Sequence, residues 1–303
     1  MSNNLNSFKK KYIFLGDLES INVELIAKSF NHLKNKIKYI IIGDLKSTKK
    51  ILKQLNFDIE INCIFNPFDF EKINNNKLNI FDLYNPKLNK VENILNQLKF
   101  TNNLCNTTGY DLVTMPIDKS LIKRKIEFIG MTEYLGQINK CRTFMLMYGE
   151  NFSIIPITTH INLRKASINL NQKLKEFFYG FNLNKFHLNE YKNFIFLCFN
   201  PHCGENGLLG DEDYTISKSL FKNLKRCKLI PGDSAFKNYN KNTLYFSLYH
   251  DQALIPFKIL NKKTANITIG LKYRRLSPAH GVAKDIRLKN LADNLSYLQC
   301  MLI

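Results

Sequence analysis

The sequence predicts an α/β protein in which mostly parallel sheets are covered by helices. Short apolar runs, which are typical of buried strands, alternate along the chain with segments of helical periodicity. The chain has 303 residues, of which 45% are hydrophobic and 23% are charged. It is therefore long enough, and apolar enough, to form two domains with separate cores.

The elements are expected in the following order along the chain. A strand from Tyr12 to Leu15 is followed by a helix at 21–33, and a strand from Tyr39 to Ile42 by a lysine-rich helix. Further strands are expected at 112–114, 144–147, 152–158, 194–198, 244–248 and 267–269, and further helices at 171–181, 213–225 and 291–302. The Asn- and Lys-rich segment 72–77 is the best candidate for a loop.

The net charge of the chain is +19, from 44 Lys and Arg against 25 Asp and Glu. Such a charge would suit a nucleic-acid-binding protein, but the lysines are spread along the whole chain, and charge alone specifies no groove contact. Gly and Pro number only 13 and 8, as expected from drift toward the AT-rich codons of Lys, Asn and Ile. We therefore expect no nucleic-acid partner, although the positive field would attract an anionic substrate.

The seven cysteines are an odd number and include no Cys-x-x-Cys spacing. This pattern argues against a disulfide framework and a cysteine-based zinc site, so we expect reduced thiols and a cytoplasmic protein. The apolar run from Tyr12 to Leu15 is too short for a signal peptide. No later run approaches the length of a membrane span, and no membrane association is expected.

Three of the six histidines, His160, His202 and His250, close apolar strand-like runs. In open α/β sheets ligands bind at the carboxyl ends of the strands, so these three side chains could converge. Neutral imidazole is a strong ligand for zinc and similar ions, and three imidazoles leave positions open for a substrate. The pattern thus suggests a shared divalent metal site. The alternative is that each histidine is structural or faces solvent, as a single histidine at a strand end usually does.

The residues after these histidines allow two interpretations each. His202 opens a glycine-rich loop, 203–210, and the acidic residues 211–213 after it would begin a helix well. The loop could let a ligand approach its backbone, or it could be an ordinary connection. Asp251 could orient an imidazole, accept a proton or cap a helix. No segment reads Gly-x-Gly-x-x-Gly, so the residues that would bind a nicotinamide cofactor are unknown.

At these histidines the sequence resembles the 4-hydroxythreonine-4-phosphate dehydrogenase family, which works in pyridoxal phosphate (vitamin B6) synthesis. The resemblance is carried by several short motifs that occur in family order from about Val113 to the C-terminus. The motifs are Thr158-Thr-His160, Asn200-Pro-His-Cys-Gly-Glu205, Tyr249-His-Asp-Gln252, Thr114-Met-Pro-Ile-Asp-Lys119, Gly130-Met-Thr-Glu133, Asn266-Ile-Thr-Ile-Gly-Leu271 and Arg275-Leu-Ser-Pro-Ala-His-Gly281. Each motif alone is weak, but the ordered set is specific.

The resemblance implies two α/β/α domains with the active site in the cleft between them. Residues 1–130 and 271–303 would form the first domain and 131–270 the second. It also implies a homodimer with the active site at the subunit interface, and one divalent metal (zinc, magnesium or cobalt) bound by the three histidines. By the same pattern, the substrate-contacting positions are Thr132, Lys258, Asn266 and Arg275.

The family oxidises the C3 hydroxyl of 4-phosphohydroxy-L-threonine with NAD or NADP. The resulting keto acid loses carbon dioxide and gives 3-amino-2-oxopropyl phosphate. In this chain Arg275 and Lys258 would suit the phosphate and carboxylate of such a substrate chemically. Asp251 and Lys119 are candidate proton carriers.

The sequence departs from the family pattern at three places. Met131 stands where the family usually has a substrate-binding histidine, and a thioether cannot donate the same hydrogen bond. Ala279 replaces a usual Asp, and the loop from Gly16 to Glu24 lacks the family's further Gly and Pro residues. Two alternatives therefore stay open: a paralogue that acts on another four-carbon phosphorylated hydroxy acid, and a non-catalytic relative that binds metal or phosphate.

Overall fold

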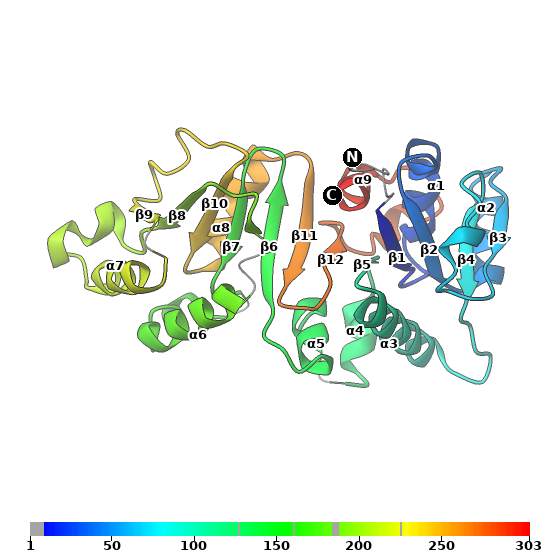
Figure 1. The fold of residues 1–303 in the computed structure, drawn as a ribbon, viewed down its shortest axis with the longest axis horizontal. Helices are drawn as coiled ribbons and strands as arrows, with labels where there is room; N and C mark the ends of the chain where they lie inside the picture. The colour runs from blue at the N-terminus through cyan, green and yellow to red at the C-terminus, as the bar shows by residue number, and fades with distance from the viewer. Residues whose placement is uncertain (1–8, 127, 160, 184–187, 225) are drawn as a thin grey trace, which may run out of the picture. The chain divides into compact units, whose positions relative to one another are not determined.

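A computed structural model describes residues 9–126, 128–159, 161–183, 188–224 and 226–303 (Figure 1). It divides into two compact units. Unit 1 consists of Met1–Leu135 and Leu271–Ile303, and unit 2 of Gly136–Gly270. The boundaries expected from the sequence were after residues 130 and 270.

Unit 1 contains a parallel sheet in the strand order β3-β4-β2-β1-β5-β12. Its central strands are almost wholly buried, as strands with helices on both faces must be. The six strands are β1 (Lys10–Phe14), β2 (Lys38–Gly43), β3 (Ile61–Cys63), β4 (Leu78–Asp82), β5 (Asp111–Thr114) and β12 (Arg275–Ser277).

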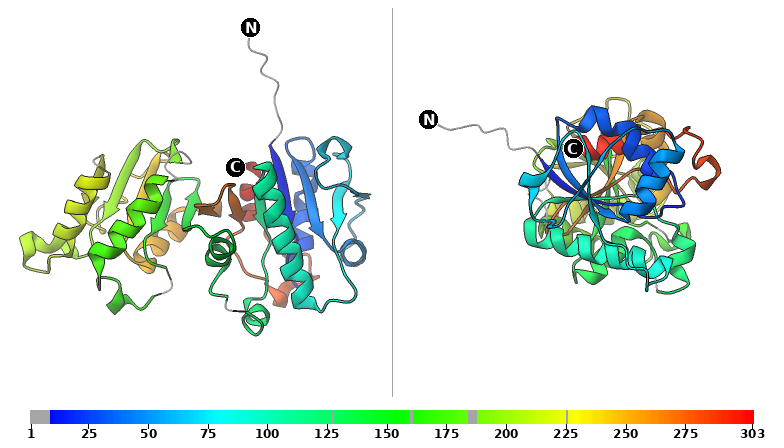
Figure 2. Two further views of the ribbon diagram at one scale, coloured as in Figure 1. Left: turned by 60° about the horizontal axis from the view of Figure 1, so that its bottom comes forward. Right: turned by 90° about the vertical axis from the view of Figure 1, so that its right-hand side faces the viewer.

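The helices of unit 1 cover both faces of this sheet. Figures 1 and 2 show α1 beside α9 on one face and α3 on the other. The helices are α1 (Asn22–Leu33), α2 (Leu45–Gln54), α3 (Lys90–Thr108), α4 (Lys119–Lys123) and α9 (Leu295–Leu302), with short 3-10 turns at Phe70–Lys72 and Lys284–Ile286. Helix α5 (Met131–Ile138) crosses the boundary between the units.

Several of these helices begin at side chains suited to capping. The carboxylate of Asp44 accepts from the backbone N–H of Ser47 at the start of α2, and Asn89 and Glu92 form a reciprocal capping box at the start of α3. Helix α3 ends at Gly109, which has a φ of 71° and adopts the left-handed conformation that glycine tolerates.

Unit 2 contains a mixed sheet in the strand order β11-β6-β7-β10-β8-β9. Strand β6 runs antiparallel to both β11 and β7, whereas the pairs β7–β10, β10–β8 and β8–β9 are parallel. The strands are β6 (Phe144–Gly149), β7 (Ser153–Pro156), β8 (Asn193–Leu197), β9 (Cys227–Ile230), β10 (Thr243–Ser247) and β11 (Thr264–Ile269).

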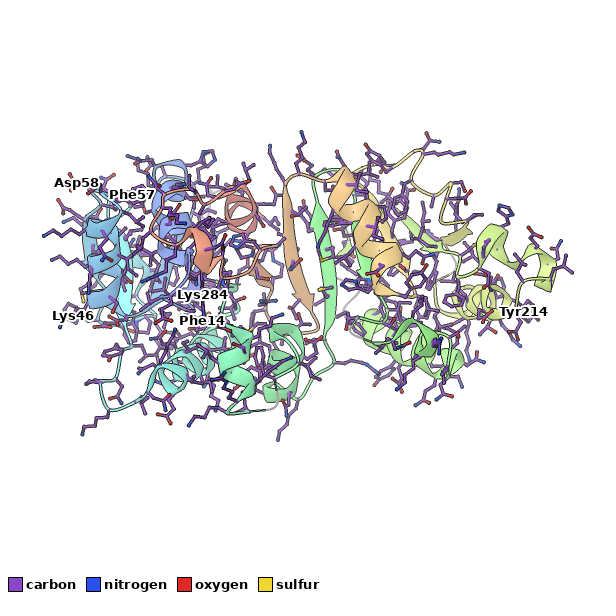
Figure 3. All side chains as sticks on the ribbon, turned by 180° about the vertical axis from the view of Figure 1, so that it is seen from behind. Phe14, Lys46, Phe57, Asp58, Tyr214 and Lys284 are labelled. Atoms are coloured by element: carbon purple, nitrogen blue, oxygen red, sulfur yellow. A yellow bond between two sulfur atoms is a disulfide. The ribbon has the colours of Figure 1, made fainter. Side chains whose placement is uncertain are left out.

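Helices also lie on both faces of the sheet in unit 2. Figure 1 shows α6 and α7 on one face, and Figure 3, which views the molecule from behind, shows α8 in front of the other. The helices are α6 (Leu170–Leu183), α7 (Glu212–Asn223) and α8 (His250–Leu260), with 3-10 turns at Leu163–Lys165 and Pro201–Gly207. An aromatic cluster around Phe152, Tyr245 and Phe257 fills the core beneath α8.

The predicted α/β fold class with mostly parallel sheets is confirmed, and each predicted strand overlaps an observed one. Four strands, β3, β4, β9 and β12, and four helices, α3, α4, α5 and α8, were not predicted. The strands are only three to five residues long, and too few residues are available to show a period. Helix α9 begins at Leu295 instead of Leu291, because the preceding backbone bonds to α1: Ala292 donates its N–H to Glu24. Among the described residues, every helix is too short or too polar to cross a bilayer.

Candidate active-site residues

Two of the three motif histidines follow neighbouring parallel strands of unit 2. Strand β10 lies between β7 and β8, and the register aligns Ser247 with Pro156 and Phe246 with Phe196, so the carboxyl ends of all three strands meet at one edge. His250 follows the end of β10, and His202 follows the end of β8. His160, which follows β7 in the sequence, lies outside the described residues. This topology is the one in which side chains that follow the strands can bind a ligand together at the carboxyl edge of the sheet.

His250 is the first residue of helix α8. The preceding residue, Tyr249, is extended and serves as the N-cap without a side-chain hydrogen bond. The Nδ1 atom of His250 lies 2.7 Å from Oδ1 of Asp251. A carboxylate bound to one ring nitrogen fixes the orientation of the imidazole and makes the other nitrogen, Nε2, a better metal ligand.

His202 lies in an unusual turn. The five residues from His202 to Asn206 all have left-handed backbone angles, with φ of 49°, 56°, 79°, 46° and 58°, and only Gly204 among them is a glycine. Each non-glycine residue in this conformation costs about 1 to 2 kcal/mol. Such a turn persists only where surrounding contacts hold it.

The imidazole of His202 is paired within the same turn. Its Nδ1 atom lies 2.9 Å from Oε1 of Glu205, the same kind of pairing as that of His250 with Asp251. The hydrogen bond with this carboxylate, together with its charge, raises the pKa of His202 above its ordinary value. Glu205 had not been singled out from the sequence, although its spacing of three residues from His202 is the signal that could have revealed it.

The segment before this turn is held by the N-terminal end of helix α7. The buried carboxylate of Asp213 accepts from the backbone N–H groups of Phe199 at 2.7 Å and Asn200 at 2.9 Å. The Nδ2 atom of Asn200 donates to Glu212 at 2.8 Å. The acidic residues after the glycine-rich loop therefore do more than begin a helix, because they bind the backbone that leads to His202.

A disulfide between Cys198 and Cys203 closes the same segment. The expectation that all seven thiols are reduced is therefore wrong for this pair, while Cys63, Cys105, Cys141, Cys227 and Cys300 are free. The two residues are five apart in sequence, and the turn brings their Cα atoms to 5.1 Å, within the range that disulfides span. The spacing alone gave no signal, because the turn that folds Cys203 back is left-handed and mostly not glycine.

Gln252 connects the two histidine segments. Its Oε1 accepts from Ser247 Oγ at 2.7 Å, and its Nε2 donates to the carbonyl of Cys198 at 2.7 Å. Gln252 is in the first turn of α8, two residues after His250, whereas Cys198 directly follows β8. The start of α8 and the end of β8 are thus fixed to each other by one amide side chain.

The described residues contain no cluster of three or more His, Cys, Asp or Glu side chains placed to hold a metal. This result does not include His160. The donor chemistry at the sheet edge nevertheless fits a divalent metal, since both described histidines have Nδ1 on a carboxylate and neutral imidazole is a ligand for zinc and cobalt.

Two further predicted residues lie in unit 2. Asn266 is in β11, and its Oδ1 atom is buried with no hydrogen-bond partner in the described part of the chain. A buried acceptor without a partner is rare in proteins and is often satisfied by a bound ligand. Lys258 is exposed on α8, two helical turns beyond His250. Both positions are compatible with contact to a polar substrate.

In unit 1, Arg275 is buried at the start of β12. Its Nε atom donates to Oγ1 of Thr114 at 2.8 Å, which fixes the guanidinium at the end of β5. Burial lowers the pKa of Arg275 to about 10, so the side chain stays charged at neutral pH. Thr132 is partly buried in α5, and Lys119 is exposed at the first position of α4, after its cap residue Asp118.

Met131 is buried at the start of α5 and belongs to the apolar core of unit 1. A thioether in this environment contributes packing and cannot replace the hydrogen bond of an imidazole. The altered loop after β1 is nonetheless well formed. Gly16 has a φ of 74°, and a Cβ atom there would lie 2.7 Å from the carbonyl oxygen of Pro116, so only glycine fits. The side chain of Asn22 bonds to the carbonyls of Leu15 and Pro116.

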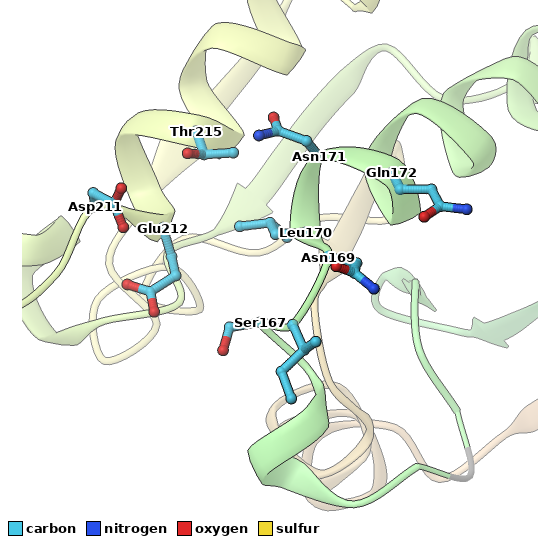
Figure 4. Close-up of a pocket in the computed structure, with 9 residues that line it drawn as sticks. Ser167, Asn169, Leu170, Asn171, Gln172, Asp211, Glu212 and Thr215 are labelled. Atoms are coloured by element: carbon cyan, nitrogen blue, oxygen red, sulfur yellow. The ribbon is translucent and has the colours of Figure 1, made fainter.

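A cavity of about 480 Å³ in unit 2 lies where helices α6 and α7 begin (Figure 4). One wall comes from the segment after His160, with Ser167 and Asn169, and the other from the segment after His202, with Asp211 and Glu212. The two carboxylates disfavour a phosphate group in this cavity by like-charge repulsion. The cavity is therefore a poor candidate for the binding site of a phosphorylated substrate.

The chain matches the family model described as pyridoxal phosphate biosynthetic protein PdxA over residues 35–303. The chain belongs to this family. It is 38% identical over 200 residues to 4-hydroxythreonine-4-phosphate dehydrogenase of Hydrogenobaculum sp. (strain Y04AAS1), a match that spans 61% of this chain and 62% of that protein. It is 29% identical over 315 residues to the protein of the same name from Sulfurihydrogenibium sp. (strain YO3AOP1), with 96% of each chain covered.

The fold is also that of a solved PdxA-family structure. The crystal structure of 4-hydroxythreonine-4-phosphate dehydrogenase from Klebsiella pneumoniae superposes with a TM-score of 0.81 at 24% identity, covering 97% of both chains. The family predicted from the ordered motifs is confirmed by the match to the family model. The structure adds residues to this site that had not been predicted, because their contacts join parts of the chain that the sequence does not show together. These residues are Glu205, Asp213, Gln252 and the Cys198–Cys203 pair.

Proposed function

We propose that this PdxA-family chain oxidises 4-phosphohydroxy-L-threonine with NAD or NADP and decarboxylates the product to 3-amino-2-oxopropyl phosphate, in pyridoxine 5'-phosphate synthesis. The support is family membership over residues 35–303 together with two carboxylate-paired imidazoles that follow neighbouring parallel strands of unit 2. The relatives that bear this enzyme's name include one matched over 96% of both chains.

The residues proposed to hold a divalent metal are His160, His202 and His250. A bound metal would act as a Lewis acid toward the substrate hydroxyl and, later, toward the carbonyl that oxidation creates. Glu205 and Asp251 orient the imidazoles of His202 and His250 by binding their Nδ1 atoms. Imidazole ligands suit zinc or cobalt better than magnesium, although all three are candidates.

The remaining roles are assigned by charge and position. Arg275, fixed by Thr114, and the exposed Lys258 are proposed to bind the phosphate and carboxylate of the substrate. Asn266 would place its buried Oδ1 atom against a substrate donor, and Thr132 would contribute a hydroxyl. Asp251 and Lys119 are the proposed proton carriers, Asp251 because it is three-quarters exposed beside His250.

A nicotinamide cofactor would accept the hydride, and no residue of this chain is assigned to bind it. We further propose that the protein acts in the cytoplasm as a homodimer. The net charge of +19 supports attraction of a doubly charged phosphorylated substrate.

A specific observation favours one second candidate, a paralogue with another four-carbon phosphorylated hydroxy acid as substrate. Met131 is a buried core residue where the family pattern has a histidine, so one substrate hydrogen bond would be missing. The loss of a single neutral hydrogen bond changes binding by about 1 kcal/mol, which is small enough for the original substrate to remain usable. The first candidate is therefore preferred.

The test is reduction of NAD or NADP, followed by absorbance, by the metal-loaded protein with 4-phosphohydroxy-L-threonine. Wild type should turn over, and His202→Ala should lose at least about a hundredfold in rate, because a metal ligand is removed. His32→Ala is the matched control, since His32 is an exposed histidine in the last turn of α1. Turnover by His202→Ala equal to that of wild type would contradict the metal mechanism. Turnover only with a different phosphorylated hydroxy acid would favour the paralogue.

A further inference from the structure

We infer that Cys198 and Cys203 form a reversible dithiol–disulfide pair whose oxidation holds the loop that carries His202. The loop has one fixed end and one end that can move. Cys198 is fixed to the sheet, because its N–H donates to the carbonyl of Ile230 at 2.9 Å and its carbonyl accepts from Gln252. Cys203 lies in the left-handed turn, directly after His202. The disulfide therefore joins the rigid end of β8 to the residue next to the proposed metal ligand.

The turn depends on such a link because its backbone is strained. Four of its five left-handed residues are not glycine, and these conformations are kept only where several contacts impose them. The turn also has hydrogen bonds of its own: Leu208 donates to the carbonyl of Glu205 at 3.3 Å, Leu209 donates to the carbonyl of Gly204 at 3.1 Å, and His202 is paired with the exposed Glu205. Asp213 holds only the backbone before the turn, at Phe199 and Asn200. Without the disulfide the turn loses one of these restraints, and we expect its backbone to sample ordinary right-handed or extended angles more often.

The two cysteine residues differ in exposure in a way that suits exchange with a thiol. Cys198 is buried, whereas Cys203 is partly exposed and is flanked by the exposed residues His202 and Glu205. A reducing thiolate would attack Sγ of Cys203, the disulfide bond would break, and Cys198 would leave and take up a proton. A second thiol of the reductant then displaces Cys203, so that a dithiol becomes a disulfide and the protein gains two thiols.

Oxidation is the reverse exchange with a disulfide such as oxidised glutathione. The two protein thiols form the bond, and two molecules of reduced glutathione leave. A disulfide in the proposed cytoplasmic setting would be transient and responsive to redox conditions. Of the seven cysteines only this pair lies in the loop of a motif histidine, so the effect of oxidation would be local to His202.

The consequence for metal binding rests on the proposed function. Closure of the disulfide restricts His202 to the orientation in which Glu205 binds Nδ1, and a ligand held in advance loses less conformational freedom on binding. We expect the oxidised protein to bind Co²⁺ about tenfold more tightly than the reduced protein.

The first test measures the loop itself and needs no metal. Full-length protein is equilibrated at a series of ratios of reduced to oxidised glutathione, and the pair is quantified by alkylation and mass spectrometry. Hydrogen exchange is then measured for the peptide covering residues 199–209. The inference predicts that both cysteines pass reversibly between thiol and disulfide at the same glutathione ratio. Backbone amide hydrogens of this peptide should exchange about tenfold faster in the reduced state. Cys203→Ser should exchange at the fast rate at every ratio, and Cys63→Ser, an exposed cysteine of unit 1, should behave as wild type.

Cysteines that stay alkylatable at every ratio, or exchange that is the same in both states, would overturn the inference. The second test is Co²⁺ titration of the oxidised protein and of the reduced protein after removal of the reductant. Equal Co²⁺ affinity in the oxidised and reduced protein would contradict the claim that the disulfide controls metal binding. Absence of Co²⁺ binding in both states would instead contradict the proposed metal site, and the exchange measurement would still decide whether the pair controls the loop.

Discussion

His202 and His250 follow neighbouring strands at the same edge of unit 2, yet the chain holds them by different means. His250 begins a regular helix, and its carboxylate partner is the next residue, Asp251. His202 is in a left-handed turn that depends on Glu205, on the disulfide from Cys198 and, through the preceding backbone, on α7.

The difference shows that one kind of ligand can be placed by local or by long-range contacts. The position of His250 follows from where a strand ends and a helix starts, so few substitutions away from it should matter. The position of His202 is imposed against the preference of its own backbone, so it should be sensitive to distant changes. The pair thus combines one proposed ligand held by local contacts with one held by long-range contacts.

The largest expected effect comes from the long-range support of His202. Asp213→Ala removes the acceptor of two backbone N–H groups, at Phe199 and Asn200, and should lower the free energy of unfolding by about 2 to 3 kcal/mol. Asp213→Asn keeps one acceptor oxygen and should lose about half as much. Urea unfolding monitored by circular dichroism measures both. A typical hydrogen bond contributes at least about 0.5 kcal/mol to stability. A smaller loss in Asp213→Ala would show that α7 does not hold the loop.

A smaller effect is expected from the carboxylates that bind the imidazoles. Glu205→Gln and Asp251→Asn keep the shape of each side chain but weaken its hold on Nδ1, and each should reduce Co²⁺ affinity by about tenfold. If the comparison is right, only Glu205→Gln should also speed hydrogen exchange across residues 199–209. Equal exchange in the two variants would mean that His202 is held no differently from His250. Calorimetric titration with Co²⁺ and exchange by mass spectrometry provide the two readouts.

The sequence was informative where structure follows from regular patterns. The runs of β1, β2, β7, β8 and β10 are apolar enough to be recognised, and His202 and His250 follow the ends of β8 and β10, as their positions in the sequence had indicated. The ordered motifs identified the family. Patterns of this kind depend on neighbours in the chain, and the sequence displays those neighbours directly.

The contacts that hold His202 could not be predicted in the same way. Neither the left-handed turn nor the pairing of Cys198 with Cys203 is required by residue type, since only Gly204 and Asn206 of the five residues are types that commonly adopt positive φ. Asp213 lies more than ten residues from the backbone that it binds, and its carboxylate looks the same in sequence as any acid at a helix start. Met131 was interpreted from the sequence as a departure from the family pattern, but its burial and its role in packing required the structure.

The central claim is that His202 and His250 are ligands of a divalent metal at one edge of the unit 2 sheet. Co²⁺ titration of wild type, His202→Ala and His250→Ala tests it most directly, with absorption of the bound ion as the signal. The account predicts one ion per chain in wild type and a loss of affinity of at least about a hundredfold in each variant, because each lacks a ligand. Binding of one ion with wild-type affinity by either variant would contradict it.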